Sequence, residues 1–268
     1  MFHDLLSFLV IFQLSNKLDQ KKKIYFASDV HLGAPTIDNH REHERRFVSW
    51  LDSIKETASE IYLLGDIFDF WFEYKKAVPK GFARFIGKLC ELTDAGIIVH
   101  FFTGNHDIWI FDYLPSETGV IVHKEPLIKE IDGFRFFIAH GDGLTRYEGW
   151  YKFLKSIFTN RVAQWFFRWL HPDLGIKFAT VWSKQSRSKN RKESYEAKKA
   201  EGDKWLISWA RETLEKEHFD FFVFGHRHVS MDINLTDTSR FIYLGDWITL
   251  FSYGEWDGSH FELKKFYS

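Results

Sequence analysis

The sequence predicts an α/β protein in which a parallel part is followed by an antiparallel part. Apolar runs of strand length recur along the 268 residues, and each run ends in a cluster of polar residues. Segments with helical spacing of apolar residues separate the first three runs. After Phe224 the runs become shorter and are separated by Thr, Asp, Gly and Ser, which is typical of antiparallel strands.

The first three runs are interpreted as buried parallel strands at 23–27, 60–64 and 97–102. Between the first two, Phe47, Leu51 and Ile54 are spaced along one helical face, so the chain begins as β-α-β-α-β. Further strands are expected at 135–139, 220–224, 229–235, 240–244 and 260–263. In such a fold, ligands bind on loops beyond the carboxyl ends of the strands.

The strand pattern stops between Leu144 and Trp205. This segment contains fourteen Lys and Arg residues but only six Asp and Glu residues, together with many aromatic residues. This composition predicts a helical lid insertion over about 144–215. Most of its aromatic residues can pack against the lid's own core. The run 161–170, however, carries more Trp and Phe than one buried helix face can hide, so part of it should contact lipid, substrate tails or a partner.

Residues 1–22 form an amino-terminal extension ahead of a domain at 23–268. Its apolar run at 5–12 is too short to cross a bilayer and follows no Lys or Arg, so a standard signal peptide is not expected. An interfacial helix, a packed segment and a non-native upstream start remain open. The net charge of −1 gives no overall attraction to nucleic acid, and the single Cys90 fits a reducing cytoplasm.

Five polar clusters follow predicted strands, and each contains a potential metal ligand. They are Asp29-Val30-His31, Gly65-Asp66-Ile67-Phe68-Asp69, Gly104-Asn105-His106-Asp107, His140-Gly141-Asp142 and Gly225-His226-Arg227-His228. Both side chains of an Asp-x-His or His-x-His pair converge only if the backbone leaves the β pleat. Flanking glycines, Gly33, Gly65, Gly104, Gly141 and Gly225, would permit this departure.

Any one cluster could simply cap a helix or form a turn. Together they supply seven oxygen and nitrogen donors, whose burial would be costly without a compensating metal charge. A donor set of carboxylate, imidazole and amide without thiolate suits Mn²⁺, Fe²⁺ or catalytic Zn²⁺ and does not choose among them. We expect two divalent ions, with Mn²⁺ as the first expectation. A carboxylate bridging ions about 3.5–4 Å apart would activate a shared water for in-line attack on phosphorus.

These motifs, in this order, resemble the calcineurin-like metallophosphoesterase superfamily. The resemblance extends over about 24–263 and implies a four-layer α/β/β/α sandwich of mixed sheets. It implies that Asp29, His31, Asp66 and His228 hold one ion, while Asp66, Asn105, His140 and His226 hold the other. By the same resemblance Asp66 bridges the ions, and His106 stands over the phosphate to stabilise charge or protonate the leaving oxygen. Asp69, Asp107 and Asp142 are expected to orient imidazoles.

The segments 28–33 and 65–71, together with a helical insertion after 140–144, resemble the UDP-2,3-diacylglucosamine diphosphatase family of lipid A synthesis. This implies hydrolysis to 2,3-diacylglucosamine 1-phosphate and UMP by an enzyme peripheral to the cytoplasmic face of the inner membrane. The best-known branch of that family carries Arg where this chain has His106, which leaves room for another substrate. Expected substrate contacts are Asn105, His106, Arg146, Glu148, Ser186, Arg187, Lys189 and Asn190.

Three alternatives remain open at this point. A related phosphoesterase could act on another nucleotide-linked lipid or on a phosphodiester, and a nuclease could use the same metals. A catalytically inactive scaffold is disfavoured because all seven donors are present. No nucleic-acid partner and no obligate protein partner are expected.

Overall fold

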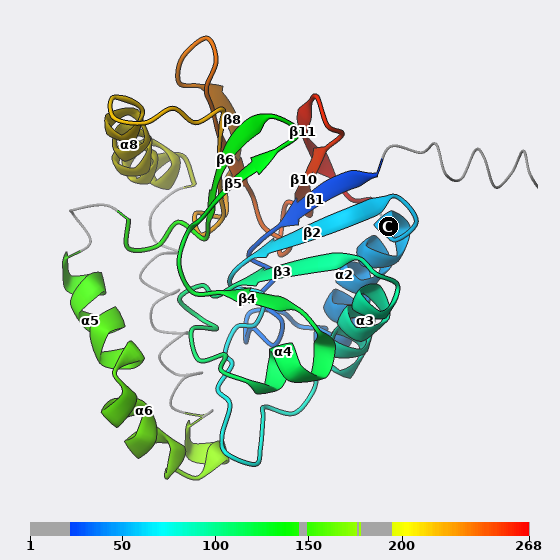
Figure 1. Cartoon of the computed structure of the whole chain (residues 1–268). Helices are drawn as coiled ribbons and strands as arrows, with labels where there is room; N and C mark the ends of the chain where they lie inside the picture. Colours follow the sequence, from blue (N-terminus) through cyan, green and yellow to red (C-terminus); the bar gives the residue numbers. More distant parts are fainter. Residues whose placement is uncertain (1–21, 145–148, 176, 178–194, 268) are drawn as a thin grey trace, which may run out of the picture.

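Two mixed β-sheets stack face to face, with helices on the outer face of each sheet (Figure 1). The computed structural model describes residues 22–144, 149–175, 177 and 195–267. Within this part of the chain, no helix combines the length and apolarity needed to cross a membrane.

The first sheet has the strand order β11-β10-β1-β2-β3-β4. Its strands are β1 (Lys23–Ala27), β2 (Ala58–Leu64), β3 (Ile98–Phe102), β4 (Ile121–His123), β10 (Ser252–Trp256) and β11 (Phe261–Lys265). The first four run parallel, and β10 joins β1 in antiparallel pairing. Helices α2 (His40–Ile54), α3 (Ala83–Asp94) and α4 (Tyr113–Thr118) lie on the side of this sheet away from the second sheet (Figure 1).

The second sheet has the order β5-β6-β7-β9-β8, with a parallel centre and antiparallel edges. Its strands are β5 (Leu127–Ile131), β6 (Phe134–Ala139), β7 (Phe221–Phe224), β8 (Ser230–Asn234) and β9 (Arg240–Leu244). Helix α8 (Tyr195–Leu214) packs on its outer face through buried Leu206 and Ala210.

Three apolar cores separate these four layers. On β1, Tyr25 and Ala27 pack toward the helices while Ile24 and Phe26 pack toward the second sheet, as the alternation of strand side chains requires. A third core joins α8 to the second sheet through Phe222 and its neighbours. The expected α/β/β/α sandwich of mixed sheets is confirmed.

Every strand expected from the sequence occurs, with ends that agree within two residues. Three further strands, β4, β5 and β10, were not expected. The first has only three residues, and on β5 exposed and half-buried residues alternate, so neither shows a continuous apolar run. Strand β10 contains Gly254, which weakens a strand pattern, but a Cβ there would overlap the ring of Phe261.

The region of the expected lid contains two kinds of segment. Helices α5 (Gly149–Thr159) and α6 (Arg161–Arg168) lie along the side of the sandwich opposite α2 and α3 (Figure 1). The ring of Phe167 on α6 packs against Phe72 and Trp109, and the Trp109 indole donates a hydrogen bond to the Phe158 carbonyl at 2.8 Å. The later part of α8 belongs instead to the outer layer. The limits of the insertion, 144–215, stay a prediction.

A polar cluster joins the two sheets near β4 and β5. The Glu60 carboxylate accepts hydrogen bonds from the Tyr62 hydroxyl at 2.5 Å and from the Lys129 ammonium at 2.7 Å. Its Oε2 lies 3.3 Å from Nε2 of His100, whose other ring nitrogen is 2.9 Å from His123. Burial acts to raise the pKa of Glu60, but hydrogen bonds from His100, Lys129 and Tyr62 outweigh it and lower the pKa to about 2.

We expect Glu60→Gln to lower the free energy of unfolding by about 1–3 kcal/mol at pH 7, because the ionised acceptor is lost. Because folding lowers the pKa of Glu60, its ionised carboxylate stabilises the folded state at pH values above the pKa in the unfolded chain, about 4.3. This contribution to the free energy of unfolding is lost as the pH falls toward 2. The difference between wild type and variant, measured by urea unfolding, should therefore narrow below about pH 4.5. A pH-independent difference would contradict the assignment; Glu262→Gln, on the exposed edge, serves as the control.

Candidate metal centre

The seven predicted ligands meet at the carboxyl ends of strands from both sheets. Asp29 and His31 follow β1, Asp66 follows β2, Asn105 follows β3, His140 follows β6, and His226 and His228 follow β7. The site therefore lies where the loops of the two sheets converge, as expected for an α/β fold.

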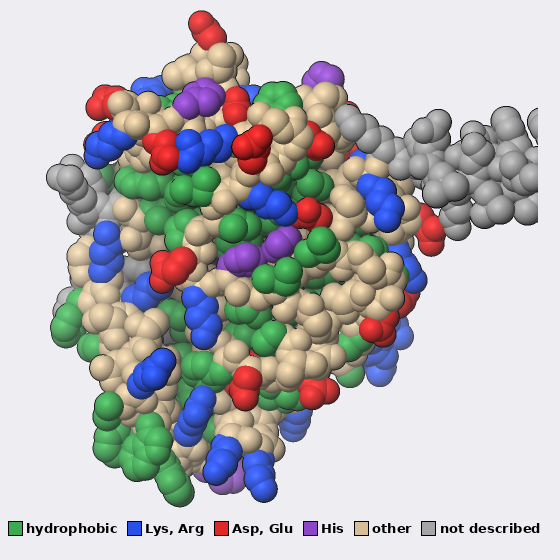
Figure 2. Space-filling view, viewed as in Figure 1, with side chains coloured by type: hydrophobic (Ala, Val, Ile, Leu, Met, Phe, Trp, Pro, Cys, Tyr) green, Lys and Arg blue, Asp and Glu red, His purple; other side chains and the backbone are tan. Residues whose placement is uncertain are grey.

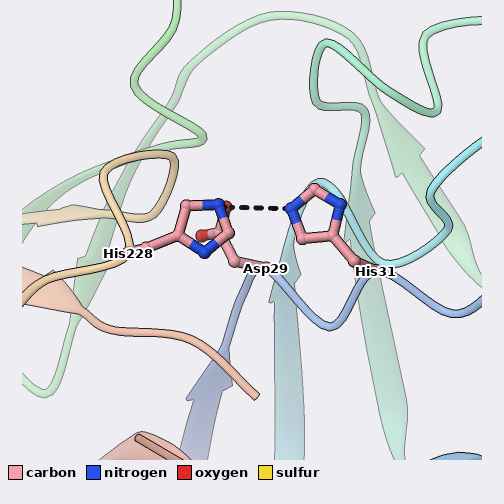
Figure 3. Close-up of side chains that lie close together, drawn as sticks. All are labelled: Asp29, His31 and His228. Atoms are coloured by element: carbon pink, nitrogen blue, oxygen red, sulfur yellow. Dashed lines mark ion pairs between the residues drawn. The ribbon is translucent and has the colours of Figure 1, made fainter. Parts of the chain in front are cut away.

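Asp29, His31 and His228 form one group of potential ligands (Figure 3). Their donor atoms lie within 4.8 Å of one another. Asp29 Oδ1 is 3.8 Å from His31 Nε2 and 3.4 Å from His228 Nε2, and the two imidazole rings stack with centroids 5.0 Å apart. The three side chains thus turn toward a common point.

Asp66, His140 and His226 form a second group. Asp66 Oδ2 lies 3.5 Å from His140 Nε2, which in turn is 3.3 Å from Asn105 Oδ1. The same Asp66 oxygen is 3.6 Å from His31 Nε2 in the first group. Asp66 therefore lies between the two groups, where a bridging carboxylate would be needed.

Five of the seven residues adopt the left-handed backbone conformation, which is unusual for residues other than glycine. Their φ angles are 55° at Asp29, 51° at His31, 53° at Asp66, 69° at His226 and 54° at His228. Each such residue costs about 1–3 kcal/mol unless its surroundings hold it. The backbone therefore leaves the β pleat at the ligands themselves, whereas the sequence analysis expected the flanking glycines to permit this departure.

Three of those glycines are needed for close packing, and a Cβ on Gly65 would overlap the Gly104 backbone and the His140 ring. A Cβ on Gly104 would overlap the side chain and backbone of Asp66, and one on Gly225 would overlap Ser28 and Asp29. Neither has a positive φ, whereas Gly33, Gly65 and Gly141 do. Glycine is thus required at Gly104 and Gly225 because the loops touch there.

The chemistry of the site fits divalent cations. Asp29, His31, Asp66 and His140 are all buried, and Asp29 Oδ1 accepts no hydrogen bond from the described residues. Burying a carboxylate oxygen without a partner is unfavourable, so a cation at this point would compensate it. Oxygen and imidazole donors without thiolate suit Mn²⁺, Fe²⁺ or catalytic Zn²⁺, and the geometry alone does not choose among them.

Three imidazoles have their Nδ1 atoms engaged away from the centre, which directs Nε2 inward. Nδ1 lies 3.2 Å from Asp69 Oδ1 in His31 and 3.4 Å from Asp246 Oδ2 in His228. In His140 it donates to the Leu64 carbonyl at 2.7 Å. Asp69 therefore lies where the sequence expected an orienting partner.

Asp107 has a different role from the one expected. Its carboxylate accepts hydrogen bonds from the backbone N–H groups of Asp66, Ile67, Phe68 and Gly104 at 2.7–3.3 Å. It therefore fixes the loop that carries Asp66 and does not orient an imidazole through these contacts. Burial and the neighbouring Asp66 charge raise the pKa of Asp107 to about 7.

His106 lies beside the two groups with its ring edge to that of His31, at a centroid distance of 4.8 Å. Its backbone N–H donates to Asp66 Oδ1 and its Nδ1 donates to the Asp69 carbonyl, each at 2.9 Å. Burial lowers the pKa of His106 to about 4. In its neutral form the ring has an unprotonated Nε2.

Sequence reasoning missed Asp246 and Lys155. Gly245-Asp246 follows β9 as Gly65-Asp66 follows β2, and this repeated pattern could have revealed it. Lys155 on α5 pairs with Asp142 at 2.8 Å and so connects α5 to the loop of His140. The six expected lid contacts, Arg146, Glu148, Ser186, Arg187, Lys189 and Asn190, lie outside the described residues.

The chain is similar to known proteins in sequence and in structure. A family described as calcineurin-like phosphoesterase matches residues 22–230, a range that includes all seven potential ligands and ends before Asp246. A Porphyromonas gingivalis protein named UDP-2,3-diacylglucosamine hydrolase is 39% identical over 260 residues, covering 91% of this chain and 97% of its own. A Shewanella piezotolerans protein of the same name is 25% identical over 222 residues, covering 83% and 89%. A solved E. coli phosphoesterase has a TM-score of 0.42 at 14% identity, covering 87% of each chain.

We expect Gly104→Ala to lower the free energy of unfolding by about 1–3 kcal/mol, because the added methyl must displace Asp66. The affinity for Mn²⁺, measured by calorimetric titration, should fall together with the free energy of unfolding. Gly87→Ala is the matched control: it lies in α3 with open space around its Cβ and should be neutral or stabilising by up to ~1 kcal/mol. Equal effects at both positions would contradict close packing at Gly104.

Proposed function

The chain belongs to the calcineurin-like phosphoesterase family and is a metal-dependent hydrolase, and we propose that it cleaves the pyrophosphate of UDP-2,3-diacylglucosamine. The products would be UMP and 2,3-diacylglucosamine 1-phosphate. The observation that carries the proposal is the position of Asp66 between two groups of buried ligands. The near-complete alignment with the P. gingivalis hydrolase supports the choice of substrate.

Two divalent ions, most suitably Mn²⁺, would occupy the two groups. Asp29, His31, Asp66 and His228 would hold one ion, and Asp66, Asn105, His140 and His226 the other. Bound ions would make a water nucleophile available near neutral pH and neutralise charge on the diphosphate.

The protein's own residues would position the reacting groups. Asp66 Oδ2 faces His31 and His140, while its Oδ1 is fixed by the His106 backbone N–H. The Nδ1–H of His106 donates to the Asp69 carbonyl, so the ring can donate a hydrogen bond to a phosphoryl oxygen only when Nε2 is protonated as well. The negative charge of a bound diphosphate would favour that protonated form. Asn105 is proposed as a second contact to the substrate.

We also propose that α6 contacts the cytoplasmic face of the inner membrane, where an acylated substrate would reside. Trp165, Phe166 and Trp169 are 54%, 64% and 75% exposed, although Phe167 between them is packed inward. Figure 2 shows the resulting apolar patch at the lower left, with Lys and Arg side chains near it. Exposed aromatics beside cations suit an interface with anionic lipids.

A related substrate is the second candidate, because His106 stands where the best-known diphosphatase branch carries Arg. Another nucleotide-linked lipid or a phosphodiester would use the same residues. The inactive-scaffold alternative is disfavoured by the full set of converging donors. A nuclease would show binding that weakens steeply with salt, whereas binding of acyl chains would not.

Turnover of UDP-2,3-diacylglucosamine by Mn²⁺-loaded protein should release UMP, identified by mass. Asp66→Asn should lower the rate by roughly 10²-fold or more, because it removes the charge shared by both groups. Asp94→Asn, on the exposed end of α3, is the matched control and should retain wild-type turnover. Cleavage of a soluble aryl phosphodiester without turnover of the lipid would refute this substrate and leave the metal site standing.

Replacing Trp165, Phe166 and Trp169 together with Ser should reduce sedimentation with anionic lipid vesicles at least about tenfold, because roughly 1.5–3 kcal/mol per inserted side chain is lost. Tyr267→Ser, at an exposed position on the carboxyl-terminal tail, should leave sedimentation unchanged. Unchanged partitioning of the triple variant would refute the membrane contact.

A further inference from the structure

Asp246 is a buried carboxylate that joins its own loop to His228. Oδ1 accepts hydrogen bonds from the backbone N–H groups of Ile248, Thr249 and Leu250 at 2.7–3.0 Å. Oδ2 lies 3.4 Å from Nδ1 of His228, and the Thr249 hydroxyl lies 3.2 Å from both oxygens. Because the loop fixes Oδ1, the direction in which Oδ2 points is fixed as well.

His228 has more need of such a partner than the other imidazoles beside it. Its side chain is 36% exposed, whereas the side chains of His31 and His140 are 1% and 2% exposed. Those two rings are enclosed by neighbouring atoms, so packing adds to their hydrogen bonds in restricting rotation. An exposed ring keeps rotational freedom, and a hydrogen-bonded carboxylate can restrict it.

The loop of Asp246 also holds the backbone of Asp29. The N–H of Trp247 donates to the Asp29 carbonyl at 3.1 Å. The buried Trp247 ring packs on Phe47 and Trp50 of α2, which anchors this loop to the outer helical layer. One short loop after β9 therefore touches both Asp29 and His228, members of the first ligand group.

We propose that Asp246 is a positioning residue that keeps His228 protonated at Nδ1 and presents its Nε2 beside Asp29 and His31. The inference rests on the proposed function, because it concerns how one of the two ions would be held. It goes further because it predicts that the loop after β9 affects the binding of one ion, the one held by the first ligand group. The second group, around Asp66 and His140, is joined to the first through the His226 N–H, which donates to Asp29 Oδ2, and should depend less on this loop.

Asp246→Asn tests this assignment with little change in shape. The amide oxygen can still accept hydrogen bonds from the loop, but the amide nitrogen facing His228 is a donor and cannot accept from Nδ1–H. We expect one of two Mn²⁺ affinities, measured by calorimetric titration of metal-free protein, to fall about 10–100-fold. The other affinity should stay within twofold. Asp232→Asn, in an exposed pair with Arg240, is the matched control.

A spectroscopic measurement separates orientation from general destabilisation. In Zn²⁺-loaded protein with ¹⁵N-labelled histidine, the His228 ring should carry its proton on Nδ1. In Asp246→Asn this signal should be lost or shifted, while the signals of His31 and His140 remain. Rescue by Asp246→Glu, even if partial, would support a role for the carboxylate.

Wild-type affinity at both sites of Asp246→Asn, with an unchanged His228 signal, would overturn the inference. Equal weakening of both sites together with a lower melting temperature would also overturn it, because a structural role would then suffice. His228→Ala is the reference for loss of one ion. If wild-type protein binds neither ion, the proposed function fails and this inference fails with it. If His228→Ala loses one ion and Asp246→Asn loses none, only this inference fails.

Discussion

The Asp66 carboxylate connects every part of the metal centre. One oxygen lies within 3.6 Å of His31 and 3.5 Å of His140, from different sheets, and the other accepts the His106 N–H. Its backbone N–H donates to Asp107, and its carbonyl accepts from His31. Burial acts to raise the pKa of Asp66, but His140 and His106 outweigh it and hold the pKa well below its usual range. A charged group at this point needs cationic or hydrogen-bonding partners on all sides, and the surrounding loops provide them.

The sandwich explains how residues distant in sequence reach this carboxylate. The carboxyl ends of β1, β2 and β3 in one sheet meet those of β6 and β7 in the other, and the apolar layer between the sheets fixes their separation. Gly104 and Gly225 allow the loops to touch. The close contact leaves the ligands little freedom, and several of them adopt the left-handed conformation that directs alternate side chains to one side. The free energy of packing thus offsets the cost of the left-handed backbone conformations.

The sequence predicted the site because each ligand follows an apolar run long enough to be a buried strand. It did not predict the positive φ of Asp29 or His228, because nothing in the identity of Asp or His requires that conformation. Asp246 escaped notice because its role depends on where the loop after β9 meets His228, a tertiary contact. Strand β5 was missed because exposed and half-buried residues alternate along it, so its pattern is not that of a buried strand.

The loops that carry the ligands also continue into the aromatic surface beneath α6. Phe72 follows Asp66 and Asp69 in one loop, Trp109 follows Asn105 and His106 in another, and the two loops pair at Phe72 and Trp109. Both rings pack against Phe167, whose neighbours on α6 face outward. The polar centre and the apolar surface are therefore successive parts of the same two loops. The substrate proposed above, with a diphosphate next to acyl chains, would have the same order of chemistry, so this pair of loops would be placed to align both of its ends.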